Sequence, residues 1–475
     1  SAPLSLIGRV QSLPSVIFHL SSVAHVQDWL RRAAIDAGHR PFLIHGDESV
    51  TTFAEMEHEV QRIVGSLRRH DVGVGDVVAV APRNDPASVA RLFAVPRTGA
   101  AVLILNARLG PAEIADQLAL ASAVAAFDGI GGLIDPGVDG GPDSSLSLEP
   151  ERDHTNLFTS GSTGRPKPVR LTWENLEASA AASAAVLDHS SSDRWYAALP
   201  IYHVGGLSIL IRSARQHSAL YLERSFDPVR AAALLLDGTA TIGSLVAPML
   251  RQILAVEPGP YRGVKALLIG GGATPLDLLT EAVEAGLPVL PTYGMTETAS
   301  QIATRPLSDG LHPGSSAVPV PGARVRIGSD GVIEVDGAMV SPGYLGEPDR
   351  DGWLRTSDVG ELVDGRLSVL GRADDVIISG GENIHPVEIE RVLSDMEGVR
   401  SVVVVGVPSE QWGEEVVAVI EGDVAPGALE RHARYHLAGY KIPKRWVLVS
   451  SIPTVEIGKP DRAAVRALAQ PVDQS

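Results

Sequence analysis

A short segment near residue 160 has the composition of an anion-binding loop. Its hydroxyl side chains can donate hydrogen bonds, and its glycines let backbone N–H groups approach an anion closely. The segment consists of Thr159, Ser160, Gly161, Ser162, Thr163, Gly164, Arg165, Pro166 and Lys167. The pattern indicates a phosphate-binding loop, although a flexible surface loop explains the segment about as well when it is considered alone.

Two other loop motifs do not fit this segment. A Walker A loop requires Gly-Lys followed by Ser or Thr, which is absent at the required spacing. A serine-hydrolase elbow requires glycine two residues before its serine, but Ser160 stands in that place before Ser162. The chain has no cysteine, so disulfides, thiolate metal sites and cysteine nucleophiles are also excluded.

A single cation marks a second segment that could bind a ligand. Arg212 directly follows the largely apolar stretch Leu207–Ile211. Burying a guanidinium there costs several kcal/mol unless it is paired. A substrate carboxylate would supply that partner; the alternatives are an internal Asp or Glu, or a side chain that extends to the surface.

The loop at 159–167 resembles the phosphate-binding signature of the adenylate-forming superfamily, which contains acyl- and aryl-CoA ligases, luciferases and peptide-synthetase adenylation domains. Further signatures of that superfamily follow in order along the chain, which argues against a chance match. They are Leu199–Gly206, Gly270–Ala273, Thr292–Thr298, Gly352–Asp358, Gly371–Asp375 and Gly458–Lys459.

The resemblance implies an enzyme that uses ATP and Mg²⁺ to adenylate a carboxylic acid and then transfers the acyl group to coenzyme A (CoA). It assigns catalysis to Lys459, which bridges the carboxylate and α-phosphate, to His203 beside the acyl site, and to Glu297 as the magnesium ligand. Asp358 then accepts the ribose hydroxyls. The remaining nucleotide-binding residues that it implies are Thr159–Gly164, Lys167, Gly271, Gly272, Tyr293, Gly294, Thr296 and Arg372.

The same resemblance implies a mobile C-terminal domain. Asp374 matches the hinge about which that domain turns between adenylation and thioester formation. Gly380 and Gly381 would then reach the pantetheine tunnel. Candidate contacts of CoA outside the tunnel are Trp412, Tyr440 and Lys444, which a solvated basic rim would explain equally well.

Two segments narrow the choice of acid. Leu199–Arg212 and Thr292–Ile302 resemble the 2-succinylbenzoate-CoA ligases of menaquinone biosynthesis, whereas Ser379–Glu390 also resembles halobenzoate-CoA ligases. The alternatives are therefore another aryl- or fatty-acyl-CoA ligase, or an amide ligase that uses an amine in place of CoA. The candidate acid-binding residues are Arg212, Ser244, Ala273, Met295 and Ser300.

Two residues depart from the family pattern. Pro168 stands where glycine is usual after Lys167, so the end of the loop loses a backbone donor. Ser357 replaces the commoner glycine before Asp358. Neither change removes a charged catalytic group, so activity is still expected.

The elements that must position these residues alternate between helix and strand. Helices are predicted at Val26–Ala37, Phe53–Arg69, Pro86–Arg97, Pro111–Leu120, after Trp173 and near Leu207–Ala214, with strands at Val77–Ala81, Ala101–Leu105, Trp195–Leu199, Ala219–Leu222 and Val264–Ile269. This pattern predicts an α/β fold. Short alternating strands after Tyr293 suggest a small β-subdomain, and residues 129–150 suggest an exposed connector.

We therefore expect a large N-terminal domain over residues 1–373, followed by a small mobile α+β domain over 374–475. The length of 475 residues agrees with several domains or subdomains. With 57 acidic and 40 basic residues, the net charge of −17 disfavours a nucleic-acid footprint. No apolar run has membrane length, so we expect a cytoplasmic enzyme that acts on a small carboxylic acid, with a homodimer left open.

Overall fold

The structure, a computed structural model, describes residues 27–127, 148–159, 167–272, 274–309, 317–409, 411–455 and 460–470. The helices α2 (Phe53–Arg69), α3 (Pro86–Arg97) and α4 (Pro111–Leu120) have the predicted bounds. Capping residues explain where α2 and α3 begin. Thr52 and Glu55 form a capping box before α2, and Asp85 caps α3 ahead of Pro86.

The largest sheet in the described part of the chain has nine strands, and its central strands run parallel from β12 to β1. Short antiparallel strands close both edges. In spatial order the strands are β14 (Val318–Pro319), β13 (Ala303–Thr304), β12 (Val289–Tyr293), β11 (Ala266–Gly270), β10 (Ile242–Val246), β8 (Arg194–Ala197), β9 (Ala219–Leu222), β1 (Pro41–Ile44) and β2 (Val50–Thr52).

A second sheet carries the predicted phosphate loop. Strands β6 and β7 form an antiparallel hairpin in which Thr159 faces Lys167, so residues 160–166 connect the two strands. These connecting residues lie outside the described part. The strand order is β17 (Gly343–Tyr344), β7 (Lys167–Thr172), β6 (Asp153–Thr159), β4 (Ala101–Ile104), β3 (Val77–Val80) and β5 (Ala125–Ala126).

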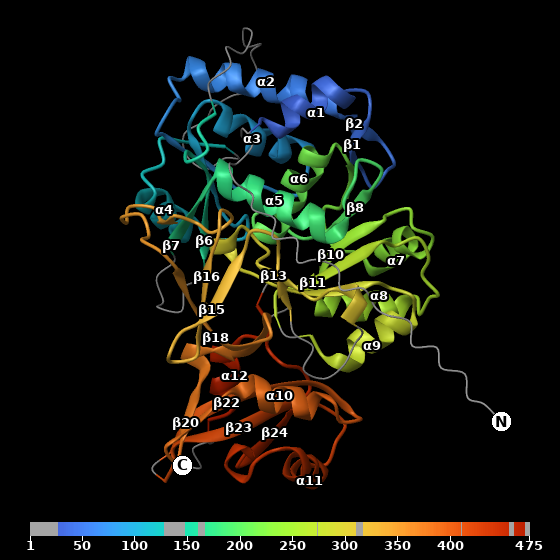
Figure 1. The fold of residues 1–475 in the computed structure, drawn as a ribbon, viewed down its shortest axis with the longest axis vertical. Coiled ribbons are helices and arrows are strands. Elements are labelled where there is room, and N and C mark those ends of the chain that lie inside the picture. The colour runs from blue at the N-terminus through green and yellow to red at the C-terminus, as the bar shows by residue number, and fades with distance from the viewer. Residues whose placement is uncertain are drawn as a thin grey trace, which may run out of the picture.

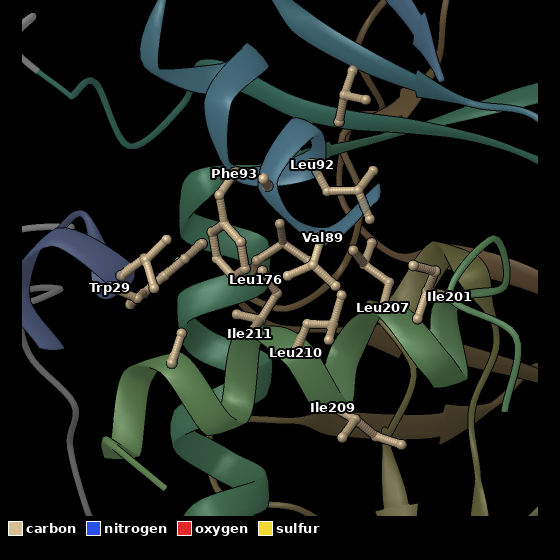
Figure 2. Packing of buried hydrophobic residues seen from close by; sticks show 14 of the residues in the cluster. Trp29, Val89, Leu92, Phe93, Leu176, Ile201, Leu207, Ile209, Leu210 and Ile211 are labelled. Atoms are coloured by element: carbon tan, nitrogen blue, oxygen red, sulfur yellow. The ribbon is translucent and has the colours of Figure 1, made fainter. Parts of the chain in front are cut away.

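One continuous core joins the two sheets. It contains residues of both sheets together with α1 (Trp29–Ala37), α2, α3, α5 (Trp173–Leu187) and α6 (Val204–Gln216). Figure 2 shows Phe93 of α3 and Leu176 of α5 beside Leu210 and Ile211 of α6. A separate core covers the other face of the first sheet with α7 (Pro228–Leu236), α8 (Ala247–Val256) and α9 (Leu276–Glu284).

Helix α6 begins earlier than predicted. The apolar pattern placed its start near Leu207, but the helix starts at Val204 and includes Gly205 and Gly206. A Cβ on Gly206 would collide with the backbone carbonyl of Pro200. The glycine is therefore required for the helix to pack against the preceding loop, which explains why a poor helix former lies in its first turn.

The predicted β-subdomain is an antiparallel four-stranded sheet of β15 (Arg324–Ile327), β16 (Val332–Asp336), β18 (Leu354–Val363) and β19 (Arg366–Arg372) in the described residues. The single-turn helix η3 (Ala373–Asp375) follows it. The C-terminal unit then has its own cores and lies at the opposite end of the molecule from α1 and α2 (Figure 1). The domain boundary at residue 374 stays a prediction.

The C-terminal unit mixes helices with a sheet, as predicted for its α+β character. Its elements are β20 (Ile377–Ser379), β21 (Glu382–Ile384), α10 (Pro386–Ser394), β22 (Val399–Ser409), β23 (Gly413–Gly422), α11 (Pro426–His436), β24 (Arg445–Val449) and α12 (Arg462–Leu468). Most of the predicted connector at 129–150 lies outside the described residues. Among the helices described, none has the length and apolar character needed to cross a membrane.

Candidate active site

The carboxyl ends of the central parallel strands bring several predicted site segments together. Strand β8 leads into the loop that ends at His203, β11 leads into Gly271 and Gly272, and β12 ends at Tyr293. Ligands of open parallel sheets bind at this edge because the loops that follow neighbouring strands meet there. The topology therefore assembles motifs that lie far apart in the sequence.

The segments after β11 and β12 contain the residues of the predicted adenine slot. The last printed pair of these strands joins Ile269 to Pro291, two residues before Gly271 and Tyr293 respectively. Gly271 has φ +86°, a conformation that favours glycine, and no heavy atom lies within 4 Å of a Cβ built on Gly272. A Cβ on Gly294 would collide with the carbonyl group of Ser300. The backbone at Gly272 is therefore open, whereas Gly294 permits the close approach of Ser300.

Tyr293 links this edge to the β-subdomain. Its phenol donates a hydrogen bond to Oδ2 of Asp358 on β18, at 2.7 Å. Burial, reinforced by the nearby carboxylate, raises the pKa of Tyr293, so the phenol keeps its proton. Arg372 lies opposite Asp358 in the strand pairing, with Nη1 3.9 Å from Oδ1, while its Nε donates to Asp374 at 2.9 Å. The structure thus brings together Tyr293, Asp358, Arg372 and Asp374.

Glu297 lies near the end of the β6–β7 hairpin. Its Oε1 accepts a hydrogen bond from the hydroxyl of Tyr344, at 3.0 Å, and Tyr344 pairs through its strand with Val169 of β7. Nζ of Lys167 lies 5.2 Å from the centre of the Tyr344 ring and 2.9 Å from a carboxylate oxygen of Glu347. The predicted magnesium ligand is therefore close to the base of the predicted phosphate loop. Thr296 begins the single-turn helix η1 (Thr296–Thr298), which carries Glu297.

His203 is the residue that precedes helix α6, and a buried asparagine fixes the loop before it. Asn84 accepts a hydrogen bond from the backbone of Ile201 at 3.0 Å, and it donates to the backbone carbonyls of Leu199 and Glu223 at 3.1 and 2.9 Å. Sequence analysis missed this positioning role. The available signal was a polar amide in the short loop after a buried strand, directly before the Asp85-Pro86 helix start.

Arg212 is buried in the core, with 2% of its surface exposed, so the interpretation as a surface-reaching side chain is wrong. It forms no ion pair with an Asp or Glu in the described part of the chain. Its nearest polar contact is the side-chain oxygen of Gln301, at 3.5 Å, and its Nε has no partner among the described residues. Its guanidinium lies 6.0 Å from the centre of the Trp195 ring. Burial lowers the pKa of Arg212 to about 10, so it remains charged at neutral pH.

A narrow gap between α5 and α6, too small in this structure to hold a water molecule, lies against this guanidinium and ends at Ala299, next to the nucleotide motif. Its lining includes Ser179, Ser208, Ile211 and Ala299 together with Arg212. The acid-binding candidate Ser300 directly follows Ala299, a residue of this lining. Met295 and Ser300 are joined by the hydrogen bond from the Ser300 N–H to the Met295 carbonyl, at 3.1 Å.

Of the acid-binding candidates only Arg212 lines this gap, and Met295, Ser300 and Ser244 do not. Ser244 lies in the middle of β10, opposite Leu268, and makes no hydrogen bond to Arg212 in the described structure. Ala273 lies outside the described residues, as do Lys459 and Ser160–Gly164 of the phosphate loop.

The CoA candidates cluster on the C-terminal unit. The N–H of Gly380 donates to the carbonyl of Trp412 at 2.8 Å, and a Cβ on Gly380 would lie 3.3 Å from the Trp412 ring. Nζ of Lys444 lies 5.2 Å from the centre of the same ring. Gly380 and Gly381 have φ of +61° and +86°, as their tight turn requires. Tyr440 contacts Lys441 instead, and Figure 1 shows the strands of this unit well separated from α6.

Comparison with known proteins places the chain in a family. Residues 30–345 match the model of the AMP-binding enzymes, and residues 388–459 match the AMP-binding enzyme C-terminal domain. The chain belongs to the AMP-binding enzyme family. Its similar relatives include a 2-succinylbenzoate–CoA ligase of Listeria monocytogenes serotype 4b, 36% identical over 92% of this chain and 98% of the relative. A 2-succinylbenzoate–CoA ligase of a Geobacillus species is also 36% identical, over 90% and 94% of the two chains.

Solved structures of AMP-binding enzymes agree with the fold. An o-succinylbenzoate CoA synthetase from Bacillus subtilis, in complex with its acyl-adenylate intermediate, has a TM-score of 0.85 at 30% identity and covers 94% of this chain and 99% of that one. The same enzyme with ATP and magnesium ion has a TM-score of 0.82 at 30% identity, over 90% and 96%. The predicted superfamily, fold class and enzyme class, an AMP-forming ligase, are confirmed.

Proposed function

We propose that this AMP-binding enzyme is a 2-succinylbenzoate–CoA ligase that uses ATP, Mg²⁺ and CoA and serves menaquinone biosynthesis. One observation carries the choice of acid. The buried cation of Arg212 lines a narrow gap that ends beside the nucleotide motif and would have to widen to admit an acid, and no Asp or Glu of the described chain neutralises it. An acid with a second carboxylate would supply the missing partner. The curated relatives and the B. subtilis structures, which carry the same substrate in their names, support the proposal.

In the first half-reaction, a carboxylate oxygen of the acid attacks the α-phosphorus of ATP and pyrophosphate leaves. Asp358, oriented by the phenol of Tyr293, accepts hydrogen bonds from the ribose hydroxyls. The ring of Tyr293 and the bare backbone at Gly271 and Gly272 hold the adenine. Lys459 and the loop at 159–167 neutralise the charge that develops on the transferring phosphorus.

The residues around Glu297 fit a magnesium ion held together with ATP. The Glu297 carboxylate is oriented by Tyr344 near the hairpin loop, and proteins commonly bind Mg²⁺ through one or two carboxylates plus substrate phosphates. When bound, the ion offsets negative charge on the phosphates. In the second half-reaction the CoA thiol attacks the acyl carbon and AMP leaves, with His203 bordering the acyl group and Gly380 and Gly381 lining the pantetheine path.

Pyrophosphate exchange into ATP tests the first half-reaction directly. The purified enzyme is assayed with 2-succinylbenzoate, benzoate, a halobenzoate and a medium-chain fatty acid, and each assay is repeated with CoA to detect the thioester. We expect exchange and thioester formation to be fastest with 2-succinylbenzoate. Preference for a monocarboxylate, or an adenylate that reacts with amines but not with CoA, would refute the proposal.

Replacement of the buried cation tests the choice of acid. Arg212→Leu should lower kcat/KM for 2-succinylbenzoate by about 10- to 150-fold, because a charge-assisted hydrogen bond contributes roughly 1.5–3 kcal/mol. Slow reactions with monocarboxylates should change little. Arg215→Leu is the matched control, since Arg215 lies on the same helix but pairs with Glu177 at 2.8 Å. A stable Arg212→Leu variant with unchanged acid preference would remove this support, so thermal melting is measured alongside.

Two further expectations accompany the proposed reaction. Since ATP and CoA are cytoplasmic metabolites, we propose a cytoplasmic enzyme, which cell fractionation would check. A homodimer stays a prediction, and sedimentation of the purified chain would decide it.

A further inference from the structure

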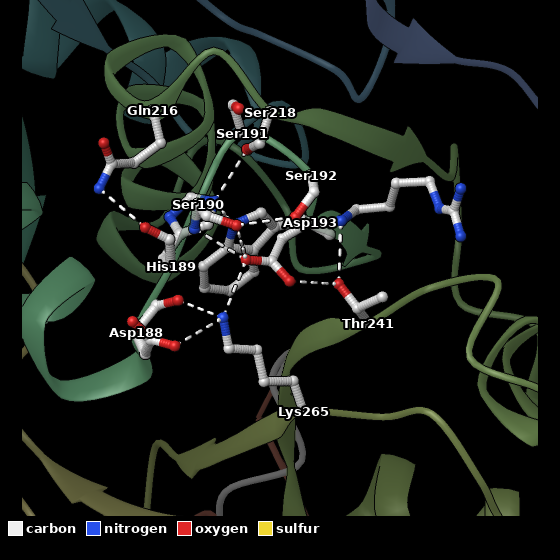
Figure 3. Close-up of polar contacts among 12 residues, drawn as sticks. Asp188, His189, Ser190, Ser191, Ser192, Asp193, Gln216, Ser218, Thr241 and Lys265 are labelled. Carbon is white, nitrogen blue, oxygen red and sulfur yellow. Dashed lines mark hydrogen bonds and ion pairs between the residues drawn. The ribbon is translucent and has the colours of Figure 1, made fainter.

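A buried histidine behind the acid pocket has no place in the proposed reaction. His189 follows helix α5, and its ring nitrogen Nε2 lies 3.1 Å from Nε1 of Trp195 and 2.8 Å from the hydroxyl of Ser218. Its backbone carbonyl accepts a hydrogen bond from the side chain of Gln216 at 3.0 Å. Figure 3 shows His189 beside Gln216, Ser218 and the turn that leads to Asp193.

The hydrogen bonds define the protonation of His189. The indole of Trp195 can only donate, so Nε2 of His189 must accept and the ring proton must lie on Nδ1. Nδ1 is buried and has no partner among the described residues. Burial, together with the cations Arg212, Lys265 and Arg215, lowers the pKa of His189 to about 4 against the opposing effect of Asp193. The imidazole is therefore a neutral acceptor at physiological pH.

Trp195 contacts both His189 and Arg212. Its side chain is fully buried on β8, with one edge hydrogen-bonded to His189 and its ring 6.0 Å from the guanidinium of Arg212. Among the described residues, the guanidinium therefore has two such contacts: the long one to Gln301 and this one to the Trp195 ring. An aromatic ring at this distance both attracts a cation and limits where it can lie.

Main-chain hydrogen bonds of His189 connect it to helices α5 and α6. Arg212 and Gln216 are one turn apart on α6, and Gln216 binds the carbonyl of His189. The N–H of His189 also donates to the carbonyl of Ala184, near the end of α5, at 2.9 Å. His189 thus makes hydrogen bonds with α5, α6 and β8.

We propose that His189 is a positioning residue for acid recognition, which holds the Trp195 ring against the Arg212 guanidinium at the gap lined by Ser179, Ser208 and Ala299. The inference rests on the proposed function, since it requires that Arg212 binds the second carboxylate of the acid. His189 itself touches neither the acid nor the nucleotide. Its loss should therefore change recognition of the acid and leave recognition of ATP unchanged.

The test measures KM for 2-succinylbenzoate and for ATP in pyrophosphate exchange. His189→Leu removes the acceptor and should raise KM for the acid about threefold to tenfold, the scale of one neutral hydrogen bond, with KM for ATP unchanged. His189→Gln keeps a side-chain acceptor and should restore KM for the acid to within about twofold of the wild-type value. His154→Leu is the matched control, because His154 is also fully buried but contacts Trp29 and Trp173 instead.

A double mutant separates positioning from general stability. In the Arg212→Leu background, adding His189→Leu should leave KM for the acid unchanged, because the residue through which His189 acts is already absent. Equal effects of His189→Leu in both backgrounds, a parallel rise in KM for ATP, or no rescue by His189→Gln would overturn the inference. A wild-type enzyme that fails to activate 2-succinylbenzoate would refute the proposed function itself, whereas an active wild type with a normal His189→Leu variant would refute only this inference.

Discussion

At the scale of single residues, the site depends on side chains whose partners lie far away in the sequence. The phenol of Tyr293 and the carboxylate of Asp358 are 65 positions apart, yet they are hydrogen-bonded at 2.7 Å. Because this hydrogen bond uses Oδ2, the other oxygen of Asp358, Oδ1, lies on the side of Arg372. The bond also fixes the orientation of the carboxylate. A carboxylate held in this way can accept the ribose hydroxyls without first being reoriented.

Tyr293→Phe tests this orienting role while keeping the ring that would contact adenine. We expect KM for ATP to rise about threefold to tenfold in pyrophosphate exchange, with a smaller change in KM for the acid. Tyr261→Phe is the control, because the Tyr261 hydroxyl donates to the backbone carbonyl of Glu257, away from the nucleotide motif. An unchanged KM for ATP would show that Asp358 is oriented by other groups.

At the scale of elements, helix α6 positions most of the residues of the proposed acid site. Its first turn packs on the loop that leads to His203, its middle carries Arg212, and its end binds the backbone of His189. Gly206 permits the close approach of the first turn to Pro200, and Asn84 holds the other side of that loop. The position of His203 relative to Arg212 therefore depends on the packing of one helix.

Gly206→Ala should destabilise the protein by about 1–3 kcal/mol, because the new methyl group collides with the carbonyl of Pro200 and forces a backbone shift. Thermal melting measures the loss, and KM for the acid should rise as the His203 loop moves. In the neighbouring Gly205→Ala variant, the nearest atom is the flexible Cδ1 of Leu199 at 3.4 Å. That variant should melt at or above the wild-type temperature, since alanine favours helix more than glycine. Similar melting temperatures for both variants would contradict the proposed close approach.

At the scale of the whole molecule, the nucleotide residues and the CoA candidates belong to different units. Tyr293, Asp358 and Glu297 lie on the large unit and the β-subdomain, whereas Gly380, Trp412 and Lys444 lie on the C-terminal unit. For the proposed reaction we therefore expect the two half-reactions to use two placements of that unit. Arg372 and Asp374 adjoin the connection between them, and their ion pair is half-exposed, so it contributes little to holding one placement.

Lys459→Ala should reduce adenylation by at least about 10²-fold, the scale expected for removing one preorganised charge from a transition state. Thioester formation from pre-formed acyl-adenylate should be retained, because the turning unit would carry Lys459 away during that step. The two half-reactions are measured separately, by pyrophosphate exchange and by consumption of synthetic adenylate with CoA. Equal loss of both would contradict the alternation of the C-terminal unit.

Asp374→Pro should leave adenylation nearly intact and slow thioester formation, because proline fixes φ at a position that must absorb a large backbone rotation. Asp374→Ala serves as the control, since it removes the same ion pair to Arg372 but keeps the backbone free. The same pair of assays distinguishes the variants. Matching rates for the proline and alanine variants would show that the hinge lies elsewhere.

The sequence by itself determined what depends on local chemistry. Capping residues set the bounds of α2 and α3, hydrophobic periodicity predicted most of the other elements, and the ordered motifs identified the family that the comparisons confirm. The tertiary structure decided the environment of each side chain. The burial of Arg212 against Trp195, the bond from Tyr293 to Asp358 and the role of Asn84 each depend on the packing of distant segments. A capping signal acts within a few residues of its own backbone, whereas the free energy of a buried charge depends on every element that excludes water around it.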